Sequence, residues 1–353
     1  MRRALLAALC FALPASAAPP DDPLSHVTII YARGGALYKS DARGKNEVEL
    51  ATLPAKSTVR ALRTDAGGKI LLVDLAGKWS WLSLDGSGKA LADLPCADGP
   101  AQLAEDAACV LCRAANGGQS IIINLATGKQ TPIAIPAPGA RIAGTGKDRK
   151  LVWADGGGVW TSPPGAPQQK KQVAPQAPIR YFTPSPDGLR AVGIYQDEVY
   201  VGGPRKKQDA DVLEGFQLDG QAVRRKGIRN GVPVEWSHDN EYVLVQDGGK
   251  ACLMRAIGGQ YKCWRGYIGV SLASDGSYAL LLGGRDKKSE PAKPKKKDDA
   301  AETEEGGDAE DDVPVPPPTG PMSLYRAELN GPYTAAPVLV ARAVDGAAVW
   351  VPQ

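Results

Sequence analysis

The chain has 353 residues, including 41 glycines and 29 prolines, and a formal net charge of +3. A charge this close to neutral is not the signature of a nucleic-acid-binding protein. Abundant glycine and proline, with little 3.6-residue periodicity, exclude a fold built on long helices. After residue 17 no apolar run reaches the roughly 18 residues that a transmembrane helix needs. We therefore expect a strand-rich protein with no nucleic-acid partner and no transmembrane segment.

Residues 1–17 have the features of an export signal. Two arginines precede an apolar run over residues 4–13, and Ala15-Ser16-Ala17 has the small-x-small pattern that signal peptidases accept. We expect cleavage after Ala17 and a periplasmic or secreted mature protein. Residues 18–25 then form a proline-rich leader, which cannot pair inside a sheet.

One hairpin pattern recurs along the chain. In its clearest copy, residues 182–192, an apolar entry and an apolar exit flank the turn Ser185-Pro186-Asp187-Gly188, which is typical of two strands joined by a tight turn. Partial copies follow at 236–244 and 273–280. Aligned in phase, the pattern places an aspartate at the first turn of six successive units of about 40 residues. These aspartates are Asp65, Asp106, Asp148, Asp187, Asp239 and Asp275.

Aspartate suits such a turn for a structural reason. Its short carboxylate accepts hydrogen bonds from backbone N–H groups two residues on, and a following glycine or asparagine tolerates positive φ. Each unit also supplies four short apolar or alternating runs. Four strands in about 40 residues are typical of one blade of a β-propeller.

The two ends of the chain predict how the ring closes. Only three strands precede Val59, and the chain finishes on residues 347–352, an apolar run with the pattern of an innermost strand. Together these fragments complete one blade. We therefore predict an all-β, seven-bladed β-propeller over residues 26–353, closed by pairing of the C-terminal strand with the N-terminal blade. Closure removes sheet edges that would invite aggregation.

Residues 285–320 interrupt the seventh unit between two predicted strands. They carry seven basic and eleven acidic side chains in separate blocks, followed by a proline tract. So few apolar groups cannot offset the entropy lost on ordering the segment, and we expect a disordered loop.

These repeats resemble those of the WD40-like, TolB-type propellers, which are recognised by a Ser-Pro-Asp-Gly turn between apolar strands. Residues 185–188 match that turn fully, and 237–240 and 273–276 match it in part. The resemblance implies a periplasmic propeller that binds protein partners. TolB has an α/β domain before its propeller, whereas here the predicted strands begin soon after the signal.

Five cysteines follow the signal, and an oxidising compartment favours their pairing. Cys252 and Cys263 flank a predicted hairpin that sets them opposite each other, so we expect a disulfide between them rather than two free thiols. A second bridge would join Cys96 to Cys112 or to Cys109 and leave one thiol odd. Cys109 and Cys112 lie in one apolar strand with side chains on opposite sides, which disfavours a redox pair.

No sequence motif identifies a catalytic or ligand site. The sequence has no nucleophile elbow, phosphate loop, His-x-x-x-His pair or calcium loop, so we expect no cofactor and no metal. The two histidines, His26 and His238, are expected to be solvated turn residues rather than ligands. The tryptophans fall within predicted strands and should pack between blades.

A basic cluster in the long fifth unit is a candidate docking patch for an acidic partner or for the acidic half of residues 285–320. It consists of Arg224, Arg225, Lys226 and Arg229, although a solvated edge strand is the simpler explanation. The sequence as a whole favours an exported, monomeric, non-enzymatic propeller that acts as a protein-interaction scaffold in the cell envelope. Two alternatives use the central funnel, an enzyme with acids or a metal and a binder of small ligands or glycans.

Overall fold

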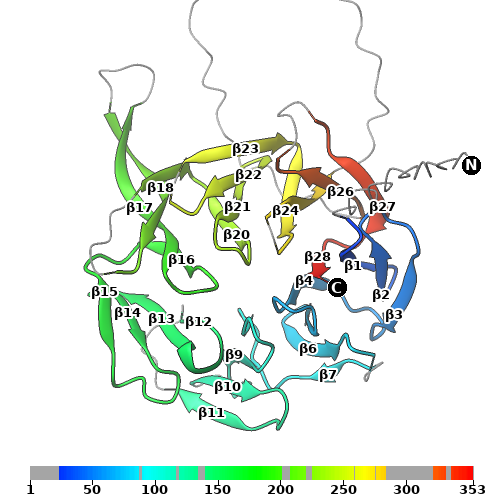
Figure 1. Cartoon of the computed structure of the whole chain (residues 1–353), viewed down its shortest axis with the longest axis horizontal. Helices are drawn as coiled ribbons and strands as arrows, with labels where there is room; N and C mark the ends of the chain where they lie inside the picture. Colours follow the sequence, from blue (N-terminus) through cyan, green and yellow to red (C-terminus); the bar gives the residue numbers. More distant parts are fainter. Residues whose placement is uncertain are drawn as a thin grey trace, which may run out of the picture.

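The computed structural model describes residues 24–86, 90–116, 119–133, 140–200, 207–219, 225–257, 259–274, 276–283, 321–330 and 335–352. In these residues, 28 strands form seven four-stranded antiparallel sheets arranged in a ring (Figure 1). The chain is therefore a seven-bladed β-propeller, as the repeats predicted. The expected signal at 1–17, most of the leader and the segment 285–320 lie outside the described residues and stay predictions.

Each blade runs from an innermost strand at the ring axis to an outermost strand at the rim. Blade 1 contains β28 (Ala348–Pro352), β1 (Val27–Arg33), β2 (Ala36–Asp41) and β3 (Val48–Thr52). Blade 2 contains β4 (Val59–Thr64), β5 (Ile70–Leu75), β6 (Lys78–Ser83) and β7 (Ala92–Asp93). Blade 3 contains β8 (Gln102–Leu103), β9 (Cys109–Arg113), β10 (Ser120–Asn124) and β11 (Gln130–Ile133).

The remaining four blades follow in chain order. Blade 4 contains β12 (Arg141–Ala143), β13 (Lys150–Asp155), β14 (Gly158–Ser162) and β15 (Lys171–Ala174). Blade 5 contains β16 (Arg180–Pro184), β17 (Arg190–Tyr200), β18 (Lys207–Gln217) and β19 (Arg225–Arg229). Blade 6 contains β20 (Val232–Trp236), β21 (Tyr242–Asp247), β22 (Lys250–Arg255) and β23 (Gln260–Arg265). Blade 7 contains β24 (Tyr267–Leu272), β25 (Tyr278–Gly283), β26 (Met322–Glu328) and β27 (Val338–Val344).

The ring closes between the two ends of the chain. β28 pairs antiparallel with β1 and places Val349 opposite Ile30, which confirms the predicted closure. Trp350, in the middle of β28, is 2% exposed, and its ring centroid lies 5.9 Å from that of Tyr278 in blade 7. The closing strand therefore completes one sheet and also packs against the next.

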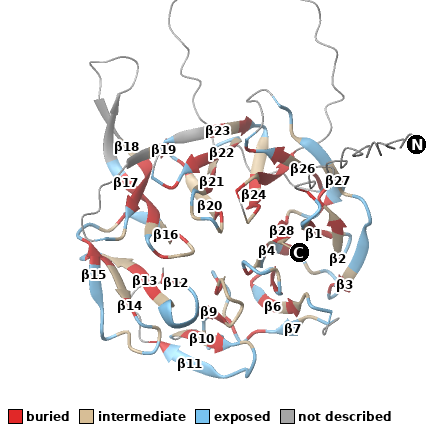
Figure 2. Cartoon of the chain, viewed as in Figure 1, coloured by how far each residue is buried: buried red, intermediate tan, exposed pale blue. Residues whose placement is uncertain are grey.

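The hydrophobic core is divided among the blades. Buried apolar side chains form seven clusters in the described residues, each shared by two neighbouring sheets. Most tryptophans lie in these clusters, as expected: Trp79, Trp153, Trp236, Trp264 and Trp350 are buried, each in a different cluster. Figure 2 shows the complementary pattern, because the outer strands β3, β11 and β27 are largely exposed.

The repeat aspartates lie between the first and second strands of their blades. Four of them accept a hydrogen bond from the backbone N–H two residues on, namely Asp65, Asp106, Asp187 and Asp239. Asp148 is exposed in a 3-10 turn (Gly146–Asp148), and Asp275 lies outside the described residues. Because neighbouring strands are antiparallel, all first-to-second turns open on one side of the ring, which we call the turn face.

Two disulfides join described cysteines. Cys252 in β22 lies directly opposite Cys263 in β23 and is bonded to it. Cys96 is bonded to Cys112, the pairing that the sequence left open. Cys109 is a free, buried thiol, and it packs in the cluster of blades 3 and 4 whereas Cys112 packs in that of blades 2 and 3. The two side chains of the Cys-x-x-Cys sequence thus point to opposite faces of β9.

None of the helices in the described part of the chain has the length and apolarity that crossing a membrane requires.

Candidate functional site in the central channel

The innermost strands surround a channel along the ring axis. A cavity of about 110 Å³ lies near the turn face, and a second of about 250 Å³ adjoins it. Arg63 in β4 and Val234 and Glu235 in β20 line both cavities, so the two are sections of one channel. The first, which we call the polar section, is lined by Arg63, Gln102, Glu105, Arg141, Glu235 and His238, among others. The second, the aliphatic section, is lined mainly by Leu62, Val234, Ile268, Val270, Ala347 and Ala348.

Two arginines reach the polar section from different blades. Arg63 comes from β4 of blade 2, and Arg141 begins β12 of blade 4. Within the described residues, neither guanidinium forms a hydrogen bond or an ion pair. Burial, followed by the neighbouring charge of Arg63, lowers the pKa of Arg141 to about 10. Arg141 therefore stays charged at neutral pH in surroundings that disfavour its charge.

Glu235 lies beside these arginines but is engaged with the neighbouring blade. Its Oε2 accepts a 2.6 Å hydrogen bond from the backbone N–H of Leu272 in β24. Burial raises the pKa of Glu235, and the bond to Leu272 and the positive charges of His238 and Arg63 oppose that rise without cancelling it. Its carboxyl group consequently takes up a proton more readily than an exposed glutamate, and it links β20 to β24.

His238 and Glu105 meet across the mouth of the channel. They lie in the first turns of blade 6 and blade 3, which are not neighbours in the ring, and His238 Nδ1 lies 2.5 Å from Glu105 Oε2. Their side chains are only 19% and 18% exposed. The expectation of a solvated His238 is therefore wrong, because its turn directs the ring across the channel toward another blade. His26 is exposed, as expected.

The surroundings of His238 favour its charged form. Burial by itself would lower the pKa of the imidazole. The hydrogen bond to Glu105 and the negative charges of Glu105, Glu235 and Asp65 together raise it above the ordinary value. The pair is thus an ion pair over a wider pH range than an isolated histidine would allow.

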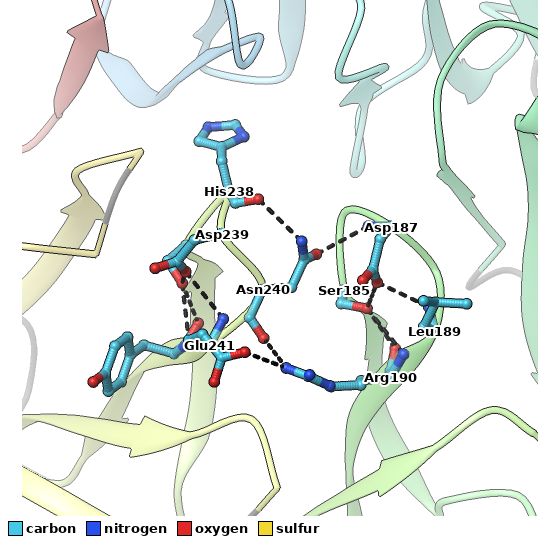
Figure 3. A network of polar contacts seen from close by, with 10 residues as sticks. Ser185, Asp187, Leu189, Arg190, His238, Asp239, Asn240 and Glu241 are labelled. Carbon is cyan, nitrogen blue, oxygen red and sulfur yellow. Dashed lines mark hydrogen bonds and ion pairs between the residues drawn. The ribbon is translucent and has the colours of Figure 1, made fainter.

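A polar network between blades 5 and 6 positions the turn that carries His238 (Figure 3). The Asn240 side chain donates to the His238 carbonyl at 3.1 Å and accepts from the Asp187 backbone N–H at 3.0 Å. Arg190 donates to the Asn240 carbonyl at 2.7 Å and pairs with Glu241 at 3.0 Å. Figure 3 shows the imidazole pointing away from this network. The repeat turn therefore does more than join two strands, because it also holds a channel side chain in place.

Sequence reasoning did not single out Arg63, Glu105, Arg141 or Glu235. A usable signal was nevertheless present, because Arg63, Glu105 and Glu235 lie within four residues of a repeat aspartate. That position is the end of an innermost strand or the start of its turn, and it faces the channel. Charged residues up to four positions before each repeat aspartate were therefore the ones to examine.

The predicted docking patch lies on the rim, away from the channel. Arg225, Lys226 and Arg229 belong to β19, the outermost strand of blade 5, and Arg229 is exposed. Arg224 lies outside the described residues. No three described His, Cys, Asp or Glu side chains are grouped so that they could hold a metal ion.

Beside this patch, β17 and β18 extend past their own blade. Their pairing continues to Tyr200 opposite Lys207. The last pairings to the flanking strands are at Ile194 on one side and at Val212 on the other. In the described residues, the end of the hairpin is thus a two-stranded ribbon that projects from the ring (Figure 1).

No family model matches the chain, and no curated protein matches it either. Solved structures similar to it include TolB from Acinetobacter baumannii, at 14% identity and a TM-score of 0.45 over 67% of this chain and 62% of that one. Another is the dihydro-heme d1 dehydrogenase NirN, at 13% identity and a TM-score of 0.49 over 96% and 77%. Hydrazine synthase of Kuenenia stuttgartiensis follows at 13% identity and a TM-score of 0.42, over 64% and 73%. With TM-scores below 0.5, these likenesses carry no argument about function.

Proposed function

We propose that this chain is an exported binding propeller whose central channel receives a small ligand. One observation carries the proposal: the polar section is lined by the exposed Arg63 and the largely buried Arg141, and neither forms an ion pair or a hydrogen bond with a described side chain. Arg63 is exposed to solvent, whereas the charge of Arg141 is disfavoured by its burial, and a buried charge without a partner is destabilising by up to several kcal/mol. Features that lower stability, such as a buried charge without a partner, are concentrated at functional sites.

The export part of the proposal has separate support. The predicted signal at residues 1–17 directs the chain out of the cytoplasm. The two disulfides are the kind of cross-link that persists in oxidising compartments.

A ligand screen tests the channel assignment without assuming the ligand's charge. We expect at least one compound from a set of cationic, neutral and anionic small molecules to raise the melting temperature by a few degrees, since a ligand at 100 times its Kd adds about 2.7 kcal/mol. The control is Val270→Phe, which fills the aliphatic section and should abolish the shift. An equal shift in both proteins would place the ligand elsewhere, and no shift with any class would overturn the proposal.

As a second candidate function, we propose that the β17–β18 ribbon docks a protein partner by strand addition. Among the described residues, no strand pairs with the outer edges of the ribbon beyond Ile194 and Asp211, and such edges can accept a strand from another chain. The basic strand β19 lies next to it.

Cross-linking mass spectrometry on cell envelopes tests this docking role. Asp197 and Ala210 form a register pair, so joining them through Asn-Gly removes the ribbon tip and leaves a two-residue hairpin turn. We expect the full chain to capture one protein reproducibly and the shortened chain to lose it. Capture that is unchanged by the shortening would contradict the assignment of the ribbon.

A further inference from the structure

The arrangement of charge in the polar section indicates what kind of ligand the channel holds. This inference rests on the proposed function, that the channel is a ligand site. Arg63 and Arg141 face the same cavity and are close enough for the charge of Arg63 to disfavour that of Arg141. A negative group placed between them would relieve this repulsion and supply the missing counter-charge.

The acidic residues of the polar section do not fill that place. Glu105 is held by His238 at 2.5 Å. Glu235 accepts the backbone N–H of Leu272 at 2.6 Å and acts on Arg63 only through its charge, without an ion-pair contact. An external anion is therefore the group that satisfies the arginine pair.

The same two glutamates limit the charge of the anion. A doubly charged phosphate monoester beside Arg63 and Arg141 would also lie near the carboxyl groups of Glu105 and Glu235, which line the same cavity. A carboxylate carries one charge and matches the planar fork of a guanidinium in a bidentate contact. The surroundings therefore favour a carboxylate over a phosphate.

The aliphatic section indicates what the carboxylate is attached to. It has a volume of about 250 Å³ and begins at Arg63, where the polar section ends. Aliphatic side chains, including Val234, Ile268 and Val270, line it together with the charged side chains of Arg60, Arg63 and Glu235. Arg60, at its edge, pairs with Asp98 at 3.4 Å. Each methylene buried there would strengthen binding roughly fourfold.

We infer that the channel binds a carboxylate carried on a short aliphatic body, with the carboxylate at Arg63 and Arg141 and the aliphatic body in the aliphatic section. A free short-chain acid and the C-terminus of an apolar peptide share this chemistry. Both present one planar anion next to a compact apolar group.

Calorimetric titration with matched probes tests the ligand class. We expect hexanoate to bind the wild-type protein, hexanamide to bind at least tenfold more weakly, and inorganic phosphate to bind more weakly than hexanoate. Arg141→Met and Arg63→Met should each weaken hexanoate binding by about 10- to 100-fold, the range of a lost charge-assisted hydrogen bond. The control Arg265→Met removes an exposed arginine of β23 outside the channel and should leave binding unchanged.

A peptide pair distinguishes the two sources of carboxylate. Acetyl-Ala-Val-Val with a free C-terminus is compared with its C-terminal amide. Tighter binding of the free peptide than of hexanoate assigns the site to a peptide terminus, and the reverse order assigns it to a free acid. If the wild-type protein binds neither hexanoate nor the free peptide, the inference is overturned.

The melting temperature of the Arg141→Met variant distinguishes a ligand-binding arginine from one that stabilises the fold. Because Arg141 is a largely buried charge with no ion-pair partner in the described part of the chain, its replacement should raise the melting temperature of the ligand-free protein while it weakens binding. A lower melting temperature would assign Arg141 to the fold and contradict the inference. A compound that binds the channel equally well in wild type and in Arg141→Met would leave the proposed function standing and overturn the carboxylate assignment alone.

Discussion

Replacing Trp350 by alanine is expected to lower the free energy of unfolding by about 3–5 kcal/mol. Trp350 is 2% exposed at the centre of β28, the strand that closes the ring, and it packs against Tyr278 of blade 7. Its removal would leave a cavity at the one junction where the two ends of the chain meet. Denaturant unfolding of the two proteins, monitored by circular dichroism, gives the difference.

Trp350→Phe is the matched control. The indole N–H of Trp350 is buried without a hydrogen-bond partner among the described residues. Phenylalanine keeps an aromatic ring and removes that unsatisfied donor, so it should lose less than half of what alanine loses. A loss below about 1 kcal/mol for alanine would mean that the closing strand is loosely packed.

Glu105→Gln is expected to destabilise the protein in a pH-dependent way. The pKa of His238 is raised in the folded state, so the ion pair stabilises fully below the unfolded pKa of about 6.5, and that contribution is lost as pH rises through the raised folded value. We expect a loss of about 1.5–3 kcal/mol at pH 6, the range for hydrogen bonds to charged groups. The difference from wild type should shrink toward pH 9, where the imidazole is neutral.

Unfolding curves from pH 5.5 to 9 measure this difference. The control background is His238→Gln, which keeps a side-chain hydrogen-bond donor and cannot titrate; there the effect of Glu105→Gln should no longer depend on pH. The other carboxylates that act on His238, Glu235 and Asp65, are unchanged in both proteins. If Glu105→Gln lowers stability by the same amount at every pH in the protein that retains His238, the charged pair is refuted.

The blades were predictable because their signals are local. The turn at Asp187 and its partial copies each depend on a few consecutive residues, and the aspartate bonds to a backbone N–H only two positions away. Alternation of apolar residues within a strand is equally short-ranged. The closing strand 347–352 could be inferred because a three-stranded beginning and a single-stranded end leave one way to complete a blade.

Of the two disulfides, one could be predicted from a local pattern and the other depended on the tertiary structure. Cys252 and Cys263 are joined across one hairpin, so a local argument sufficed to pair them. Cys96 lies in a loop outside the strands, next to Ala114. Its pairing with Cys112 rather than Cys109 depends on which face of β9 is turned toward that loop.

The channel site was beyond the reach of local patterns. Glu105 and His238 are 133 residues apart and meet only because the ring brings blades 3 and 6 to opposite sides of one opening. Arg63 and Arg141 share a cavity for the same reason. Hydrogen-bonded turns and strand periodicity depend on neighbouring residues, so both could be predicted from the sequence. The electrostatic environment of a channel side chain depends on the radius and closure of the whole ring, and it exists only once the seven blades are assembled.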